Sequence, residues 1–450
     1  MSAGSISLRR GKAAKKKPAK KRSRARVSPE YNILLTATLC LLALGAVMVF
    51  SASSTTRVLQ NGGLSDSAFY LKRTLMFGVV GLVIMHMTAR HGLKAIRDLT
   101  PLLLGASIFL LIAVLGAGTE VNGATRWIGG GFLQIQPSEF AKVALILYGA
   151  DLLARKPKRA QSLEGIMPFL LVAGASCLLI MLQPDMGTTM VICFSVAATL
   201  VAAGARPVDL GKIALVIGGL ALLMAVVEPY RMARLTSFLH PAADASGAGF
   251  QAAQAKIALG SGGLFGVGIG NGVQKAFYLP EAHTDMISAV IGEELGLVGI
   301  AGVVGLFGMF GYAGLKTAQK AKDTYSKLVV AGLTSLVLVQ ATINLFAVMG
   351  LAPLTGVPLP FVSYGNSSLM ATLFAVGLIL NVARGGRAGA ARGSTTGAGK
   401  LRVVEGGRGP ARKSQRNGSR GAKEAKGGRS GGGNGGARRT RHGGRRRASG

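Results

Sequence analysis

The sequence predicts an all-α fold, a polytopic membrane protein with about ten transmembrane helices and one large extracytoplasmic loop. Two observations carry this prediction. Hydrophobic residues make up 49% of the 450 residues, yet the formal net charge is +34, and a soluble globular domain does not combine these properties. Apolar runs near the length that crosses a bilayer, about 20 residues, also recur along the middle of the chain.

Most of the charge lies in two tails, 1–30 and 384–450. They hold 30 of the 52 Lys and Arg residues but only 3 of the 18 acidic residues. Both are predicted to be disordered, because they contain too little apolar surface to offset the entropy of folding. Basic segments beside membrane spans are attracted to anionic lipid, and we expect this membrane surface, rather than nucleic acid, as their partner.

The body between the tails, 31–383, contains the apolar runs. They are 33–53, 74–89, 101–116, 140–153, 166–182, 188–203, 213–227, 286–312, 328–349 and 366–382. An even number of spans places both termini on one side, and their basic residues place that side in the cytoplasm. The segment 228–285 then forms the large outer loop.

Four polar clusters fall on the predicted outer side of the membrane. They are 122–127 with 136–139, then 183–185, 280–285 and 358–368. Ionisable residues at membrane depth are costly and mark functional sites. We therefore expect the clusters to converge on one outward-facing polar cavity.

These clusters carry several sequence motifs in a fixed order. They are NGATRW (122–127), QPSE (136–139) with Lys142, QPD (183–185) with Gly187, RMAR (231–234), Gln254, the glycines of 262–270, LPEAHTD (279–285), GEELG (292–296) and PLPFVSYG (358–365). The ordered set resembles the SEDS family (shape, elongation, division and sporulation) over about 31–381. Ala282 and the run 231–241 are most similar to the division-type members, whereas Asn366 stands where the family usually has Gly.

The resemblance implies a peptidoglycan glycosyltransferase that polymerises lipid II into glycan strands at the division septum. It implies a multi-pass protein of the cytoplasmic (inner) membrane, with a class B penicillin-binding transpeptidase and other divisome proteins as partners. It associates activity with a divalent cation, Mg²⁺ or Mn²⁺, whose ligands the sequence does not identify. Asp285 matches the family's essential acid.

Asp285 suits general-base chemistry on its own terms. An acceptor hydroxyl becomes a good nucleophile when a carboxylate within hydrogen-bond distance removes its proton. Its position just before an apolar span also fits an N-cap of the helix beginning at Met286. Both roles stay open from the sequence, because the two carboxylate oxygens can serve different partners.

A wider set of polar residues is predicted to bind substrate. Departure of a pyrophosphate needs charge stabilisation, which Arg126, Lys142, Arg231, Arg234 and Lys275 can supply. The other predicted substrate-binding residues are Trp127, Gln136, Ser138, Glu139, Gln183, Asp185, Gln254, Glu281, His283, Ser363 and Ser368. Arg126 and Lys142 fit equally well as structural partners of Glu139 or Asp185, and Asp185 fits a helix end or a metal ligand.

Three features have plainer interpretations. The glycines of 262–270 lack the spacing of a dinucleotide-binding loop and are interpreted as a flexible outer segment. Gly292 and Gly296 have a spacing suited to close helix packing. Glu293 and Glu294 lie within a span and should face protein or water.

Two other functions compete with polymerisation. A lipid II flippase needs a polar path through the midplane to both faces, whereas the polar clusters gather on one side. A noncatalytic divisome scaffold explains the tails but leaves the expected cavity without a purpose. Polymerisation is the favoured hypothesis.

Overall fold

The computed structural model describes residues 28–60, 68–121, 124–130, 134–227, 247–276 and 278–385, together with Met232, Thr236 and Phe238. All of them belong to one compact unit, Met1–Gly393. Nearly all of both predicted tails, and most of 228–246, lie outside the described residues.

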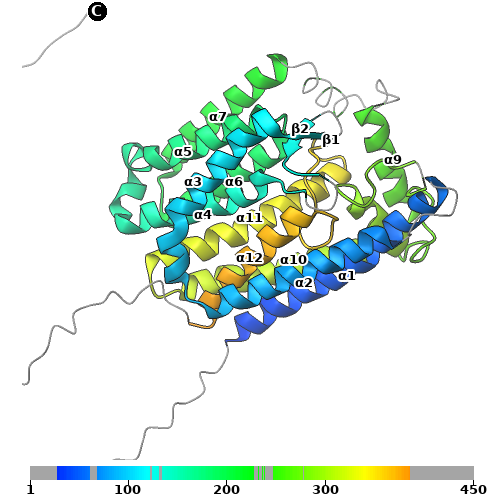
Figure 1. Ribbon diagram of the computed structural model, residues 1–450, viewed down its shortest axis with the longest axis horizontal. Helices are drawn as coiled ribbons and strands as arrows, with labels where there is room; N and C mark the ends of the chain where they lie inside the picture. Colours follow the sequence, from blue (N-terminus) through cyan, green and yellow to red (C-terminus); the bar gives the residue numbers. More distant parts are fainter. Residues whose placement is uncertain are drawn as a thin grey trace, which may run out of the picture. The chain divides into compact units, whose positions relative to one another are not determined.

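Each predicted span coincides with a long helix (Figure 1). These helices are α1 (Pro29–Gln60), α2 (Phe69–Arg90), α3 (Leu93–Ala117), α4 (Pro137–Arg155), α5 (Leu163–Met181), α6 (Met186–Ala203), α7 (Pro207–Val227), α10 (Ile287–Lys320), α11 (Thr324–Val348) and α12 (Asn366–Ala383). The shorter elements are α9 (Ala248–Ser261), the 3₁₀ helix η1 (Pro157–Gln161) and an antiparallel hairpin of β1 (Thr119–Val121) and β2 (Ala124–Trp127). The helical fold is confirmed, with this small hairpin as the addition that the sequence did not predict.

Eight helices in the described part are long and apolar enough to cross a membrane. The eight do not include α4 and α7. Helix α4 begins at Pro137, earlier than predicted, and carries Glu139, Lys142, Asp151 and Arg155. It packs against α3, α6, α11 and α12, so Glu139, Lys142 and Asp151 face protein instead of lipid, whereas Arg155 at the helix end is exposed.

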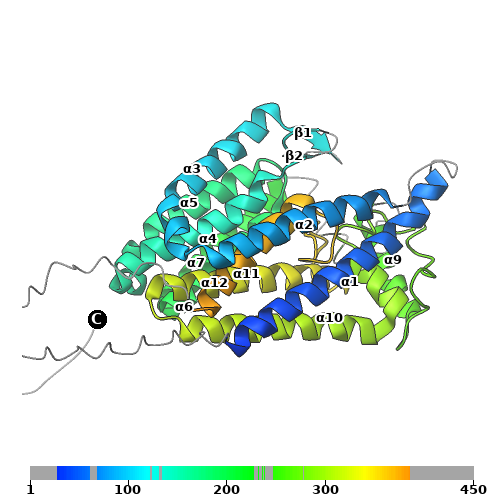
Figure 2. The same ribbon diagram turned by 60° about the horizontal axis from the view of Figure 1, so that its bottom comes forward.

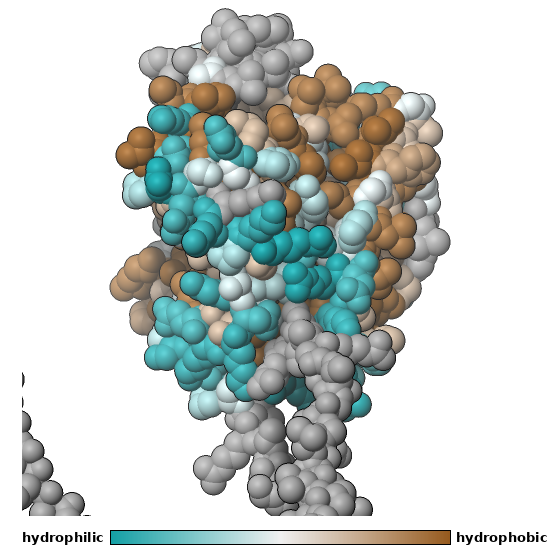
Figure 3. Space-filling view, turned by 90° about the vertical axis from the view of Figure 1, so that its left-hand side faces the viewer, coloured by the Kyte–Doolittle hydropathy of each residue, from teal (hydrophilic) through white to brown (hydrophobic). Residues whose placement is uncertain are grey.

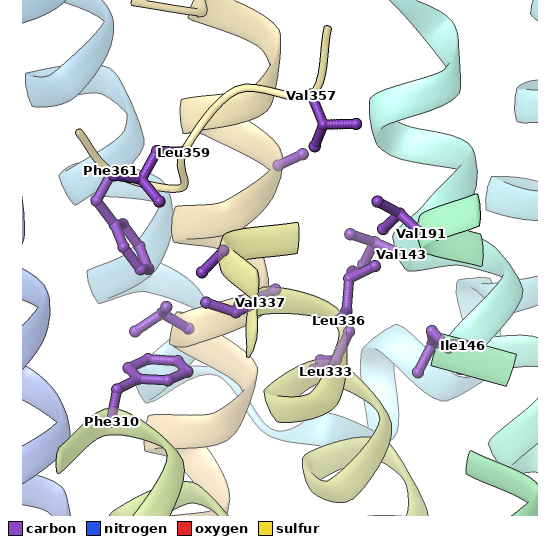
Figure 4. Close-up of a cluster of buried hydrophobic side chains, with 14 of the residues drawn as sticks. Val143, Ile146, Val191, Phe310, Leu333, Leu336, Val337, Val357, Leu359 and Phe361 are labelled. Atoms are coloured by element: carbon purple, nitrogen blue, oxygen red, sulfur yellow. The ribbon is translucent and has the colours of Figure 1, made fainter. Parts of the chain in front are cut away.

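Helix α11 lies in the middle of the unit, with α3, α4 and α5 on one side of it and α1 and α10 on the other (Figures 1 and 2). The segment 349–365 joins α11 to α12, and most of its second half, 357–363, is buried among these helices. Figure 4 shows its apolar side chains beside those of α4, α6, α10 and α11; the labelled residues are Val143, Ile146, Val191, Phe310, Leu333, Leu336, Val337, Val357, Leu359 and Phe361. The conformation of 358–365 is therefore fixed by the core.

Both ends of the described body lie together, because Ser28 Oγ donates to the Ala383 carbonyl at 2.9 Å. This arrangement is consistent with an even number of membrane crossings, which places both ends on one side. The start of α1 and the end of α12 lie near the lower left of the helical body in Figure 1, and Figure 3 shows hydrophilic residues gathered on its left-hand side. Loops rich in Lys and Arg belong on the cytoplasmic side.

Cysteine labelling tests this sidedness. In a variant lacking Cys40, Cys177 and Cys193, we expect Asn271→Cys to react with a membrane-impermeant maleimide in right-side-out vesicles, because Asn271 is exposed and belongs to the predicted outer loop. Lys158→Cys, at an exposed position in η1, should react only after the membrane is permeabilised. The reverse pattern would place the polar clusters on the cytoplasmic side.

Candidate functional site

Asp285 lies two residues before Ile287, the first residue of α10, at the edge of the protein interior. The N-cap position of α10 is Met286, without a side-chain cap, so the structure does not give Asp285 the N-cap role that its sequence position allowed. The Asp285 side chain is half-buried. Its Oδ1 accepts a hydrogen bond from Thr284 Oγ1 at 3.2 Å, and its Oδ2 lies 3.9 Å from the position that a Cβ atom on Gly356 would occupy.

The turn before Asp285 contacts the loop before α12. Tyr364 N donates to the His283 carbonyl at 2.9 Å, and the rings of His283 and Tyr364 are 5.6 Å apart between centroids. Glu281 is exposed, has a left-handed backbone with φ 54°, and accepts from Thr284 Oγ1 at 3.0 Å. Two of the four predicted polar clusters therefore meet.

Helix α2 adds two residues that the sequence analysis did not select, Tyr70 and Arg73. The Tyr70 ring lies 4.3 Å from the His283 ring and 4.8 Å from the Tyr364 ring. Burial raises the pKa of Tyr364, and nearby Arg73 opposes that shift, so the phenol is neutral at ordinary pH. A Tyr at the predicted outer end of a span is typical of membrane-interface anchoring. For this reason the sequence alone did not indicate that Tyr70 packs against His283 and Tyr364.

Asp185 caps α6 and links it to the segment before α4. Its Oδ1 accepts from Thr188 N at 3.0 Å, and its Oδ2 accepts from Thr188 Oγ1 at 2.8 Å and from Gln136 Nε2 at 3.2 Å. Gln136 N in turn donates to Ser367 Oγ at 3.0 Å. The helix-end role that the sequence allowed for Asp185 is confirmed.

Arg126, in β2, holds the short loop between α5 and α6. It donates to the carbonyls of Gln183 and Pro184, and Gln183 Nε2 donates to the Leu111 carbonyl at 2.9 Å. Arg126 thus contacts the Asp185 loop through backbone oxygens, although neither Glu139 nor Asp185 is its ion-pair partner among the described contacts. Neighbouring Trp127 is half-buried in the same hairpin.

A buried polar chain joins α4, α11 and α12. Lys142 Nζ lies 2.9 Å from Glu139 Oε1, and both residues are 3% exposed. Lys142 also donates to Gln340 Oε1 at 2.9 Å, and Gln340 Nε2 donates to the Pro358 carbonyl at 3.1 Å and to Ser368 Oγ at 3.3 Å. Gln340 was missed from the sequence, because one amide within an apolar span resembles an ordinary packing residue.

Lys275 is buried in an ion pair with Glu294 of α10. Its Nζ lies 2.6 Å from Glu294 Oε1, 3.0 Å from Ser51 Oγ and 2.8 Å from the Gly270 carbonyl. Lys275 is 2% exposed and Glu294 is fully buried. Glu293 Oε1 accepts from Val273 N at 2.7 Å. Glu293 and Glu294 therefore both contact the segment 262–276, as expected of ionisable groups that face protein.

The interpretation of 262–270 as a flexible segment is wrong. Helix α10 has a non-helical residue, Gly296, with φ 67° and ψ −162°, and the glycine-rich loop packs into this break. Val267 N and Gly268 N each donate at 3.0 Å to the carbonyls of Glu293 and Glu294, and Leu297 N donates back to Gly263 O at 3.0 Å. The glycines allow two backbones to approach closely, which a count of Gly residues cannot distinguish from flexibility.

The remaining predicted residues divide into three groups. Ser363 Oγ accepts from Leu359 N at 2.8 Å and stabilises the turn before Tyr364. Ser138 is buried at the start of α4, and Gln254 is half-buried in α9, which packs on α10. Arg231 and Arg234 lie outside the described residues.

The described part of the chain contains no group of three His, Cys, Asp or Glu side chains arranged to hold a metal ion. Both carboxylate oxygens of Asp185 accept protein hydrogen bonds, and Glu294 is paired with Lys275. These residues do not form a metal site by themselves. The divalent cation remains a prediction, and no step of the reaction is assigned to it.

The fold and the site define a polytopic helical membrane protein with one polar cluster at an end of the helices. The family model described as cell cycle protein, of the FtsW, RodA and SpoVE type, matches residues 32–388, and the chain belongs to this family. The resemblance found in the motifs is therefore confirmed.

Two curated relatives match over most of their length. A protein of Trichlorobacter lovleyi named probable peptidoglycan glycosyltransferase FtsW is 40% identical over 360 residues, which cover 79% of this chain and 94% of the relative. Stage V sporulation protein E of Bacillus subtilis is 41% identical over 364 residues, covering 80% of this chain and 98% of the relative.

Solved structures share the fold. One, described as a peptidoglycan synthase complex that coordinates polymerization and crosslinking, contains a chain with a TM-score of 0.64 and 29% identity, covering 78% of this chain and 97% of that one. The rod shape determining protein RodA of Thermus thermophilus gives a TM-score of 0.57 at 27% identity, with coverage of 78% and 96%.

Proposed function

We propose that this protein is a peptidoglycan glycosyltransferase that polymerises lipid II on the outer face of the cytoplasmic membrane at the division septum, with both termini in the cytoplasm. The names of its relatives support the enzyme class. The observation that carries the proposal is the half-buried Asp285 carboxylate, placed where the polar turn before α10 meets the loop before α12.

The proposed reaction transfers the growing glycan to a new lipid II. The acceptor 4-hydroxyl oxygen bonds to the anomeric carbon of the glycan, while the bond from that carbon to the undecaprenyl pyrophosphate oxygen breaks. Asp285 takes the hydroxyl proton as the new bond forms. Negative charge collects on the departing pyrophosphate, and cationic side chains at the site stabilise it.

Purified protein and lipid II test this function directly. We expect glycan strands from the protein alone or with its class B penicillin-binding transpeptidase. Transport of lipid II across vesicles without strand formation would favour the flippase. Neither strands nor transport, with binding of the transpeptidase retained, would favour the scaffold.

A groove between α10 and α11 offers a position for a partner's membrane span. Its volume is about 380 Å³, and its lining includes Phe307, Gly308, Leu338, Ala341 and Leu345. Small residues let helices approach closely in a bilayer. The synthase complex among the similar structures supports an assembly of this kind for the present chain.

Filling this groove should weaken partner binding. A Cβ on Gly308 would meet nothing within 4 Å, so Gly308→Leu is compatible with the helix while it occupies the groove. We expect at least about a tenfold loss of affinity for the transpeptidase, the factor that 1.4 kcal/mol of lost packing produces. Gly302→Leu, which is equally open but outside the groove lining, is the matched control, and binding measured in detergent should not change. Equal affinities for both variants would place the partner elsewhere.

A further inference from the structure

Asn344 lies in α11 and is 2% exposed. Its amide nitrogen donates two hydrogen bonds, at 2.7 Å to the backbone carbonyl of Asp285 and at 2.8 Å to the backbone carbonyl of Val357. Its amide oxygen accepts a hydrogen bond from Ser288 Oγ. One side chain thus contacts three separate points around the site.

The bond to Asp285 acts where α10 has not yet begun. The first backbone bonds of α10 run from Ala289 N and Val290 N to the Met286 carbonyl, at 2.9 and 3.4 Å. The Asp285 carbonyl precedes this ladder and accepts from Asn344 instead. Asn344 therefore holds the backbone that carries the Asp285 carboxylate.

The bond to Val357 acts on the segment that faces the Asp285 carboxylate. Asp285 Oδ2 lies 3.9 Å from the place of a Cβ on Gly356, so the carboxylate faces the backbone next to Val357. The same amide thus fixes both the residue that carries the carboxylate and the segment opposite it. The planar amide of Asn344 therefore sets the distance between the Asp285 carbonyl and the Val357 carbonyl.

We propose that Asn344 is the positioning residue for Asp285, setting the distance between its carboxylate and the 355–358 segment. The proposal rests on the proposed function, in which Asp285 is the general base. Ser288 orients the amide so that both donors point at carbonyls. Gln340, one turn earlier on α11, contacts Lys142 and Ser368. The hydrogen bond from α11 to the Asp285 carbonyl comes from Asn344.

Asn344→Leu removes both donors while it keeps the same number and branching of side-chain heavy atoms. Misplacement of a reacting group by about 1 Å costs about a hundredfold in rate, so we expect turnover in lipid II polymerisation to fall by about that factor while KM changes little. Asn381→Leu is the matched control: Asn381 is 4% exposed in α12 and donates to the carbonyls of Thr88, Ala89 and His91. The Asn381→Leu protein should lose about as much stability as the Asn344→Leu protein and should keep the turnover of the wild-type protein.

A double variant separates positioning from general damage. If Asn344 acts through Asp285, adding Asn344→Leu to Asp285→Asn should lower the residual rate no further, because coupled residues are not additive. A further fall of the same size as in the single variant would overturn the proposal. Ser288→Ala, a gentler change, should lower turnover in the same direction even if Asn344→Leu fails to fold, and wild-type turnover in Ser288→Ala would count against the proposal.

The outcomes also separate this proposal from the proposed function. Absence of strands from the wild-type protein would remove the function itself. Strands from the wild-type protein, only a small residual rate in Asp285→Asn, and equal turnover in Asn344→Leu and Asn381→Leu would retain the function and reject the role of Asn344.

Discussion

Asp285→Asn is expected to abolish nearly all lipid II polymerisation in a protein that still folds and binds its transpeptidase partner. The amide has the size of the carboxylate but cannot accept the proton of the acceptor hydroxyl. Loss of a positioned base costs about a hundredfold to ten-thousandfold in rate. Met286, not Asp285, is the N-cap residue of α10, so the substitution should cost little helix stability.

The measurement is strand formation by purified protein, with melting temperature as the check on folding. Asp185→Asn is the comparison: its amide oxygen can still cap α6, but its NH2 group cannot accept the hydrogen bond from Gln136 Nε2, so we expect a stability loss of about 1 kcal/mol with a milder effect on rate. Near-normal polymerisation by folded Asp285→Asn protein would exclude this residue as the base. Glu281 would then be the next candidate, since Glu293 and Glu294 contact the outer loop.

The sequence predicted the helices well because most of the apolar runs approach the length of a bilayer crossing. It also predicted that separate polar clusters would meet, since positive-inside topology placed all of them on one side. The contacts of Gln136 with Asp185 and Ser367, and of His283 with Tyr364, confirm that the clusters meet, while their position on the outer side stays a prediction. The ends of α4 were less predictable, because its charges made it resemble a shorter span.

Residues that hold the site together were the ones that the sequence could not reveal. Gln340 and Asn344 are single amides within an apolar helix, and their importance depends on which loops fold over α11. Tyr70 and Arg73 lie far from Tyr364 in sequence and meet it only because α2 packs along α12. Such pairings arise from tertiary contacts, about which local periodicity carries no information.

Lys275 shows the same limit for charge. In the sequence it is one of several cations available for a pyrophosphate, whereas the structure pairs it with Glu294 and Ser51 in the interior. Its direct role at the substrate remains a prediction. Its contribution to stability follows from the pairing and can be tested separately.

Lys275→Met should destabilise the protein strongly. The substitution keeps an unbranched side chain of similar length but leaves the fully buried Glu294 carboxylate without its ammonium partner. Breaking a buried pair from one side costs about 3–5 kcal/mol. The outer loop should be affected first, because Lys275 also donates to the Gly270 carbonyl.

Thermal unfolding of the purified protein in detergent measures this effect, and at about 2 °C per kcal/mol we expect the midpoint to fall by about 6 °C or more. Lys320→Met is the control: its pair with Glu30 is 60% exposed on the lysine side, and such pairs contribute about 0–1 kcal/mol. The double variant Lys275→Met, Glu294→Gln should recover much of the lost stability, because it removes the buried charge while the new amide still accepts from Ser51. A fall in the double variant equal to that of Lys275→Met alone would mean that the lysine stabilises the loop through Gly270 and packing, without a net contribution from the ion pair.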